Sequence, residues 1–531
     1  MVKQLHQAGL ALALVGAAFA AHADGEEGSL GRVQHVLLIS VDGLHAVDLS
    51  NYVQKHPGST LAALSHHGVT YTNASTSTPS DSFPGLASLV TGGSPTTTGF
   101  WYDVTWNRAV APQETGNAIM GTTGGSCPGT VGAVVELDEG VDNDLTQLDG
   151  GGGINPIYLP RNATTCKPIY PHDYLRVNTI FEVVHSHGRR TAWTDKHPSY
   201  EWTNGPSGHG VDDFYGPEIN SIPVALPYPG CTPVPYTDPT PDDGWTTSFA
   251  NIMCYDSTHV EAVLNQIEGY THDRSKHVGV PALFGTNFQA VSVGEKLKTD
   301  PVSGASGGYT DVLGTPSVGL AAELDYVDQS LGRMVNALKS EGVYDSTLII
   351  VGAKHGQSPI DVSKRRGIGG GQPAATIGAA EAFDISDDGS LIWLKDPSLA
   401  PGVVSLLSQP GSQQTLGIQE IFAGNLLRDK FNSPAQDPRT PDIILKVNTG
   451  VIFTGGSKIA EHGGFNEDDV HTALLVSNPR LNASSVNAAV SNQQVAATVV
   501  RALGYDPHEL KAVQKEDIHV LPFLFDGDHD D

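Results

Sequence analysis

The stretch HVLLISVDG, residues 35–43, decides the fold of this 531-residue chain. Its first seven residues are mostly branched and apolar, which is typical of a buried strand, and Asp42 and Gly43 end the run. Helical spacing of apolar residues follows in other segments, most clearly over 319–340 and again over 495–503. Strands that alternate with helices predict an α/β fold, a doubly wound and mostly parallel sheet flanked by helices. The other strand-like runs are 190–194, 278–284, 347–352 and 472–477.

Polar residues stand where several of these runs end. Ligands of doubly wound folds bind beyond the carboxyl ends of the strands, which is where Asp42 and His355 are expected. Ser82 starts a predicted helix, and we expect it to be the N-cap, in the positive field that stabilises an alkoxide or a phosphate. His462 precedes paired glycines. Each residue alone fits an ordinary turn, cap or structural histidine, but the four together predict one polar site.

In order and spacing these motifs resemble the nucleotide pyrophosphatase/phosphodiesterase family of the alkaline phosphatase superfamily. The block from about residue 33 to 100 is the most specific part, and more narrowly the chain is similar to secreted bacterial alkaline-phosphatase-family proteins. The resemblance implies a hydrolase of phosphoester or phosphoanhydride bonds with two metal ions, usually zinc. It implies that Ser82 is the nucleophile of a covalent phosphoenzyme. It implies metal ligation by Asp42, Ser82, His355 and His462.

The chain departs from the ligand pattern of that family at three positions. Lys354 stands where the pattern has an aspartate, and Gln289 and Val293 stand where it has an aspartate and a histidine. An ammonium and an isopropyl group do not ligate metals, so we expect one tightly held divalent ion, zinc, rather than two. Lys354 could instead supply a fixed catalytic cation at the phosphate.

Further polar residues are candidates for contacting the substrate. Three of them follow the strand-like run 190–194 and therefore project toward the same edge of the sheet, although a surface turn explains them equally well. Another is an aspartate near the place where the family often has an asparagine, and an ionised carboxylate there would repel a phosphoryl oxygen. The candidates are Asp195, Lys196, His197, Asp103, Asn107 and Asn287.

The N-terminus has the pattern of a secretory signal peptide. Lys3 precedes an apolar run over 8–21, and the triplet Ala21-His22-Ala23 fits the cleavage rule, so residues 1–23 are the expected signal. A buried N-terminal helix is the alternative. We therefore expect a secreted or periplasmic protein whose mature part, 24–531, is one catalytic domain. Its expected insertions lie near 104–175, 203–256 and 360–440, the last as a possible small cap.

Four cysteines remain in the mature chain, and an even number in an exported protein indicates two disulfides. Three pairings are possible, and we favour the sequential one. It joins Cys127 to Cys166 and Cys231 to Cys254.

The net charge of the chain restricts which kinds of molecule it is expected to bind. Thirty Lys and Arg against 58 Asp and Glu give a formal charge of −28, which disfavours binding of a nucleic-acid duplex. After the signal no apolar run is long enough for stable membrane insertion. The expected partner is a small phosphoester. Two alternatives remain: a non-catalytic or switched-substrate protein that binds a phosphorylated or sulfated ligand, and a metal-free serine esterase. Against the esterase, Ser82 does not lie in a GxSxG nucleophile elbow.

Overall fold

The computed structural model describes residues 30, 33–117, 122–222, 226–228, 230–234 and 244–525. The expected signal peptide, residues 1–23, lies outside the described residues. A central sheet of eight strands forms the framework, in the order β19-β2-β18-β11-β1-β10-β8-β9. The strands are β1 (His35–Val41), β2 (Gly68–Tyr71), β8 (Ala192–Thr194), β9 (Asp213–Tyr215), β10 (Leu283–Phe288), β11 (Thr347–Gly352), β18 (Leu474–Ser477) and β19 (Ser484–Val486).

The five strands from β11 to β9 run parallel to one another, whereas β18 is antiparallel to both of its neighbours. The predicted doubly wound, mostly parallel α/β fold is therefore confirmed. Strand β1 lies in the middle, with Ser40 beside Asn287 of β10 and Gly352 of β11. Because the carboxyl ends of these strands meet at one edge, the residues that follow them are brought together.

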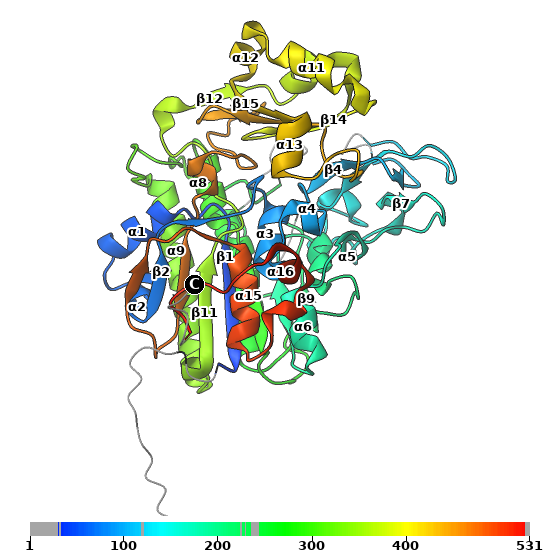
Figure 1. Ribbon diagram of the computed structural model, residues 1–531. Coiled ribbons are helices and arrows are strands. Elements are labelled where there is room, and N and C mark those ends of the chain that lie inside the picture. The colour runs from blue at the N-terminus through cyan, green and yellow to red at the C-terminus, as the bar shows by residue number, and fades with distance from the viewer. Residues whose placement is uncertain are drawn as a thin grey trace, which may run out of the picture.

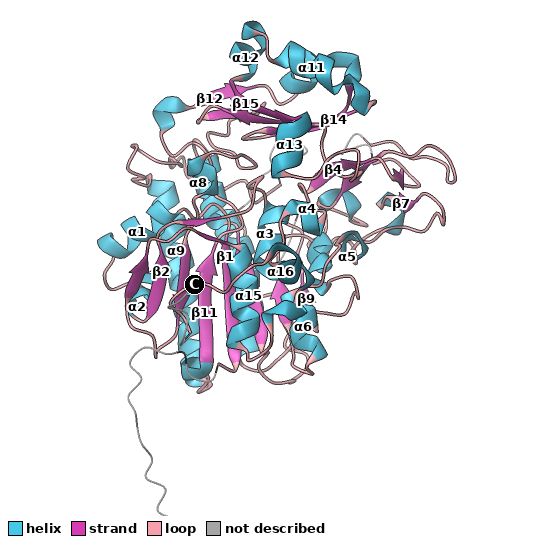
Figure 2. Ribbon diagram, in the orientation of Figure 1, coloured by secondary structure: helices cyan, strands magenta, loops and turns pink. Residues whose placement is uncertain are grey.

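Both faces of the sheet are covered by helices, as Figures 1 and 2 show. Val36 and Leu38 of β1 pack into one core and Leu37 and Ile39 into the other, which is the alternation that a strand buried on both faces requires. Helices of the first face are α3 (Ser82–Thr91), α6 (Ile180–Ser186) and α15 (Gln493–Ala502). Those of the second are α1 (Ala46–Lys55), α2 (Thr60–His66), α7 (Phe249–Ile267) and α9 (Val318–Ser340).

A second, antiparallel sheet lies above the carboxyl edge of the central strands, at the top of Figure 1. Its order is β13-β14-β16-β15, and helices α11 (Ala400–Leu407) and α12 (Pro410–Leu416) pack on it around a separate apolar core. The expected cap region, 360–440, contains most of this sheet. Its strands are β13 (Glu381–Ser386), β14 (Ser390–Leu394), β15 (Ile418–Ala423) and β16 (Ile443–Val447).

The insertion near 104–175 consists of short paired strands, β4 (Val104–Asn107) with β6 (Ala133–Glu136) and β5 (Val110–Ala111) with β7 (Arg161–Asn162). Disulfides join Cys127 to Cys166 in this insertion and Cys231 to Cys254 at the start of α7, so the sequential pairing is confirmed. Among the described helices, none combines the length and the apolar character needed to cross a membrane.

Candidate active site

Three of the predicted metal ligands lie together beyond the carboxyl ends of the central strands. Asp42 directly follows β1, His355 lies three residues after the end of β11, and His462 lies between β17 (Val451–Phe453) and α14 (Glu467–Val470). Asp42 Oδ2 is 3.5 Å from His355 Nε2, and the His355 and His462 rings lie tilted against each other with their centroids 4.0 Å apart. All three side chains are buried or nearly so, which makes this a closed polar site.

Ser82 is the first residue of α3, and the N-cap is Asp81 rather than Ser82. The Asp81 carboxylate accepts a hydrogen bond from Phe83 N at 3.0 Å. This corrects the expectation that Ser82 caps the helix, because an adjacent aspartate caps at least as well as a serine. The serine hydroxyl is thereby left free for another contact. Helix α3 also packs tightly on the loop after β11, because a Cβ on Gly85 would lie 2.0 Å from the Lys354 carbonyl oxygen.

Lys196, which follows β8, brings a positive charge to Ser82. Its Nζ donates to Ser82 Oγ at 3.0 Å and lies 3.6 Å from Asp42 Oδ2. Burial lowers the pKa of the Lys196 ammonium, but Asp42 and then Asp195 outweigh burial, so that the pKa is raised above its ordinary value. Lys196 is therefore a cation at neutral pH, and it links the serine oxygen to Asp42.

Lys354 occupies a different position from the one expected. Its ammonium donates to Asp195 Oδ1 at 2.7 Å and lies 4.2 Å from the centre of the Tyr200 ring, and the side chain is fully buried. Burial lowers the pKa of Lys354, although Asp195 and Asp42 oppose this effect. Among the described contacts, Lys196 rather than Lys354 is the lysine that touches the serine.

The donor atoms present do not fit two metal ions of the kind that the resemblance implies. Gln289 donates its amide Nε2 to Asp42 Oδ2 at 2.5 Å, so it presents a hydrogen-bond donor where a carboxylate ligand was expected. Three atoms remain as possible ligands of one ion, because Asp42 Oδ1, His355 Nε2 and His462 Nδ1 are buried and have no hydrogen-bond partner among the described residues. Burial lowers the pKa of both histidines, so that both imidazoles are neutral ligands at neutral pH.

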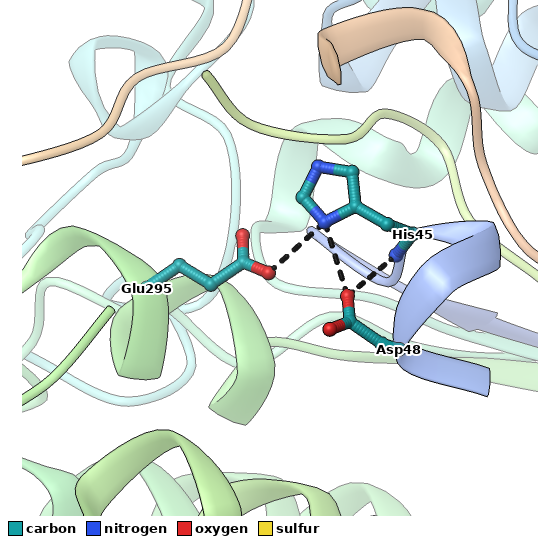
Figure 3. Close-up of side chains that lie close together, drawn as sticks. All are labelled: His45, Asp48 and Glu295. Atoms are coloured by element: carbon teal, nitrogen blue, oxygen red, sulfur yellow. Dashed lines mark hydrogen bonds and ion pairs between the residues drawn. The ribbon is translucent and has the colours of Figure 1, made fainter. Parts of the chain in front are cut away.

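A buried ion-pair cluster holds the loop that carries His355. His45 lies between Asp48 and Glu295 (Figure 3), with Nδ1 at 3.0 Å and 3.2 Å from their carboxylate oxygens. His45 Nε2 donates to the Gln357 carbonyl oxygen at 3.0 Å, which ties residue 357 to the start of α1. Burial lowers the pKa of His45, but Glu295 and Asp48 raise it well above the ordinary value. The imidazolium thus offsets one of the two carboxylate charges, and Gln357 Nε2 donates to Glu295 Oε2 at 2.6 Å.

Some of the other predicted substrate-contacting residues lie near the site, and others are held by hydrogen bonds to other residues. Asp103 lies close enough to Lys196 and His197 for both to lower its pKa, although burial is larger and raises it. Asn287 of β10 is buried, and neither of its amide atoms is hydrogen-bonded. It lies beside β1, the strand that Asp42 follows. Asn107, in contrast, is held by Tyr174 and Ala109. His197 contacts Glu218 through Nδ1 at 2.8 Å.

Two residues that the sequence did not suggest border the site. Lys296, at the end of α8 (Ala290–Lys296), places its Nζ 3.5 Å from Glu461 Oε2, directly before His462. Lys296 also lowers the pKa of His462, after burial and His355. Nothing in the local sequence indicates this role, because it depends on how α8 meets a loop more than 160 residues later.

Comparison with known proteins identifies the class. A sequence model described as type I phosphodiesterase/nucleotide pyrophosphatase matches residues 36–118 and 308–471, which include Asp42, Ser82, His355 and His462. The chain superposes on murine ectonucleotide pyrophosphatase/phosphodiesterase 5 with a TM-score of 0.53 and 14% identity, covering 89% of this chain and 95% of that one. An inactive form of that murine protein in complex with AMP gives a TM-score of 0.54, with 14% identity and the same coverage.

The alkaline phosphatase PafA gives a TM-score of 0.55 at 12% identity, covering 90% of this chain and 96% of that one. No curated protein matches the sequence. The fold and the matched segments define a hydrolase of the alkaline phosphatase superfamily that acts on phosphoester bonds. Within the chain, residues 36–118 and 308–471 match the type I phosphodiesterase/nucleotide pyrophosphatase family. Lys196 and Gln289 lie in the segment between the two matched regions.

Proposed function

We propose that the protein hydrolyses phosphoester or phosphoanhydride bonds of small nucleotide-like molecules, with Ser82 as nucleophile and Lys196 as the cation beside it. The observation that carries the proposal is the 3.0 Å contact between Lys196 Nζ and Ser82 Oγ, next to Asp42. The AMP bound by the murine relative favours a nucleoside phosphate as the substrate class.

The reaction proceeds in two displacements. Ser82 Oγ attacks phosphorus in line, the bond to the leaving oxygen breaks, and the serine proton passes through solvent to that leaving oxygen. Water then attacks the phosphoserine, and a proton returns to Oγ. Lys196, which is charged at neutral pH, is no base in this scheme. It stabilises the serine alkoxide and the phosphoryl oxygens from a fixed position.

One divalent ion, which we expect to be zinc, would be held by Asp42, His355 and His462. It would supply charge stabilisation for the phosphoryl oxygens. The buried, unpartnered atoms of these three side chains support one ion.

A second candidate function is binding of a phosphorylated or sulfated ligand without turnover, which Gln289 and Val293 favour because they remove two expected metal ligands. The test is cleavage of bis-p-nitrophenyl phosphate by wild type and Ser82→Ala, with and without chelator. Cleavage that Ser82→Ala abolishes supports the hydrolase. Binding of inorganic phosphate with no cleavage supports the second function, and cleavage of p-nitrophenyl acetate alone supports the metal-free esterase.

We also propose that residues 1–23 direct export and are removed, so that the mature protein is secreted or periplasmic. Two disulfides favour an oxidising compartment. Mass spectrometry of the exported protein should give an N-terminus at residue 24. An intact residue 1 would contradict export by this signal.

A further inference from the structure

A second group of titratable side chains lies beside the candidate active site and belongs to no function described above. It consists of Glu139, Asp142, His197 and Glu218, here called the Glu139 cluster. Three separate segments supply it: the short helix η1 (Glu139–Val141) with the residue that follows it, the residue after Lys196, and the loop after β9.

The ligand atoms of the cluster face one another. One side-chain atom each of Glu139, His197 and Glu218 lies within 4.8 Å of the other two, and His197 Nδ1 is 2.8 Å from Glu218 Oε2. Glu218 is also the charged group that acts most strongly on Asp142, and the two side chains hydrogen-bond, so this fourth carboxyl lies beside Glu218.

Asp142 is the member of the cluster whose carboxyl group receives no N–H or hydroxyl hydrogen bond. Asp142 is 4% exposed, and neither buried carboxylate oxygen accepts a hydrogen bond from an N–H or hydroxyl group among the described residues; its hydrogen bond is with the Glu218 carboxyl. Gly150 packs against this carboxylate: a Cβ there would lie 2.8 Å from Asp142 Oδ2, so a side chain would fill the space beside it. A buried carboxylate left without donors is costly unless a proton or a cation compensates it.

No cation among the described neighbours is free to supply that compensation, and a proton on Asp142 takes its place while no ion is bound. Lys196 is the cation that acts on Glu218, and its ammonium is already shared between Ser82 and Asp42. Burial and then Glu218 raise the pKa of Asp142 to about 10, and burial and then Glu139 raise that of Glu218 well above its ordinary value. Burial lowers the pKa of His197 to about 4, which leaves a neutral imidazole able to act as a ligand. The His45 cluster differs, because it contains a cation of its own, the imidazolium that lies between its two carboxylates.

We propose that Glu139, Asp142, His197 and Glu218 bind one divalent cation. A set of one imidazole and three carboxylates suits a first-row transition ion, with zinc as the first choice and manganese as the second. This ion is distinct from the one at Asp42, His355 and His462. It fixes two loops against the residue next to Lys196, and so orients the lysine that contacts Ser82.

The test is titration of zinc, and separately manganese, into chelator-treated full-length protein. Isothermal calorimetry and elemental analysis give the number of ions. We expect Asp142→Asn and Glu218→Gln each to remove one ion or to weaken it at least about 100-fold. His462→Ala should leave this ion in place, and Glu323→Gln is the matched control, since it changes a buried carboxyl outside the cluster whose oxygens also accept no N–H or hydroxyl hydrogen bond among the described residues.

Melting temperatures separate an ion site from a purely structural role. Zinc should raise the melting temperature of wild type by more than that of Asp142→Asn, which keeps only the ion at Asp42, His355 and His462. Without zinc, Asp142→Asn should melt no lower than wild type, because the amide can donate to Glu218 as the protonated Asp142 carboxyl does. The proposal is overturned if wild type binds neither metal. It is also overturned if both cluster variants keep every ion that wild type binds.

Discussion

Replacing Lys196 by methionine removes the ammonium and keeps most of the side-chain volume. The lost contact is the 3.0 Å hydrogen bond to Ser82 Oγ, together with the charge 3.6 Å from Asp42 Oδ2. A hydrogen bond to a charged group contributes about 1.5–3 kcal/mol. Removing one preorganised donor at a developing oxyanion lowers kcat by about 10²–10³. We therefore expect kcat/KM for bis-p-nitrophenyl phosphate to fall by about 10²-fold or more, with most of the loss in kcat.

The assay compares initial rates of nitrophenolate release from wild type and variant at pH 7.5. Lys196→Arg, which keeps the charge, should recover part of the loss. Lys339→Met is a matched control, because it removes an ammonium that packs over the Tyr344 ring at the end of α9, and it should change kcat/KM by less than about threefold. If folded Lys196→Met retains kcat/KM within about threefold of wild type, the lysine has no part in stabilising the transition state.

Three further predictions test other parts of the structure. Ser82→Ala should abolish the covalent phosphoenzyme, observed by intact-protein mass spectrometry after acid quench, and a phosphorylated variant would exclude Ser82 as the nucleophile. His45→Gln should lower the melting temperature more at pH 6 than at pH 9. The two carboxylates hold the pKa of His45 well above its ordinary value despite burial. The stabilisation by charged His45 is therefore complete below about pH 6.5 and is lost as the pH rises through the raised pKa. An equal loss at both pH values would contradict a charged His45. Replacing Cys127 and Cys166 by serine opens a link across 39 residues and should cost about 3–4 kcal/mol of unfolding free energy, measured in urea; no loss would mean that the bond does not constrain the unfolded chain.

The sequence predicted the central strands better than the edges of the sheet. Residues 35–41 and 347–352 are strands with the predicted bounds, because both are continuous apolar runs buried on two faces. The run 278–284 was placed too early, and the strand is Leu283–Phe288. Pro281 lacks an N–H for the ladder, which explains why pairing starts beyond it. Strands β2, β9 and β19 are three or four residues long, too short for a periodic pattern to indicate.

The candidate site was predictable as far as backbone position determines it. Asp42 and His355 follow strands that end at one edge, so their proximity is a consequence of topology. The choice between Lys196 and Lys354 was not predictable, because a lysine side chain has four rotatable bonds and its direction depends on where Asp42 and Asp195 lie. The Glu139 cluster likewise depends on insertions whose sequences carry little periodicity.

The pairing of two lysines with two aspartates explains why the site should hold fewer metal ions than the resemblance implies. Lys196 lies 3.6 Å from Asp42, and Lys354 lies 2.7 Å from Asp195, so the carboxylates that follow β1 and β8 are each next to an ammonium. Two dications placed among these groups would be repelled by the two ammonium groups, and like-charge repulsion is strong where water is excluded. They would also have too few ligand atoms. With one ion at His355 and His462, the positive charge beside Ser82 comes from the chain itself. A chelator should therefore reduce turnover without removing that charge, whereas Lys196→Met removes it with the metal in place.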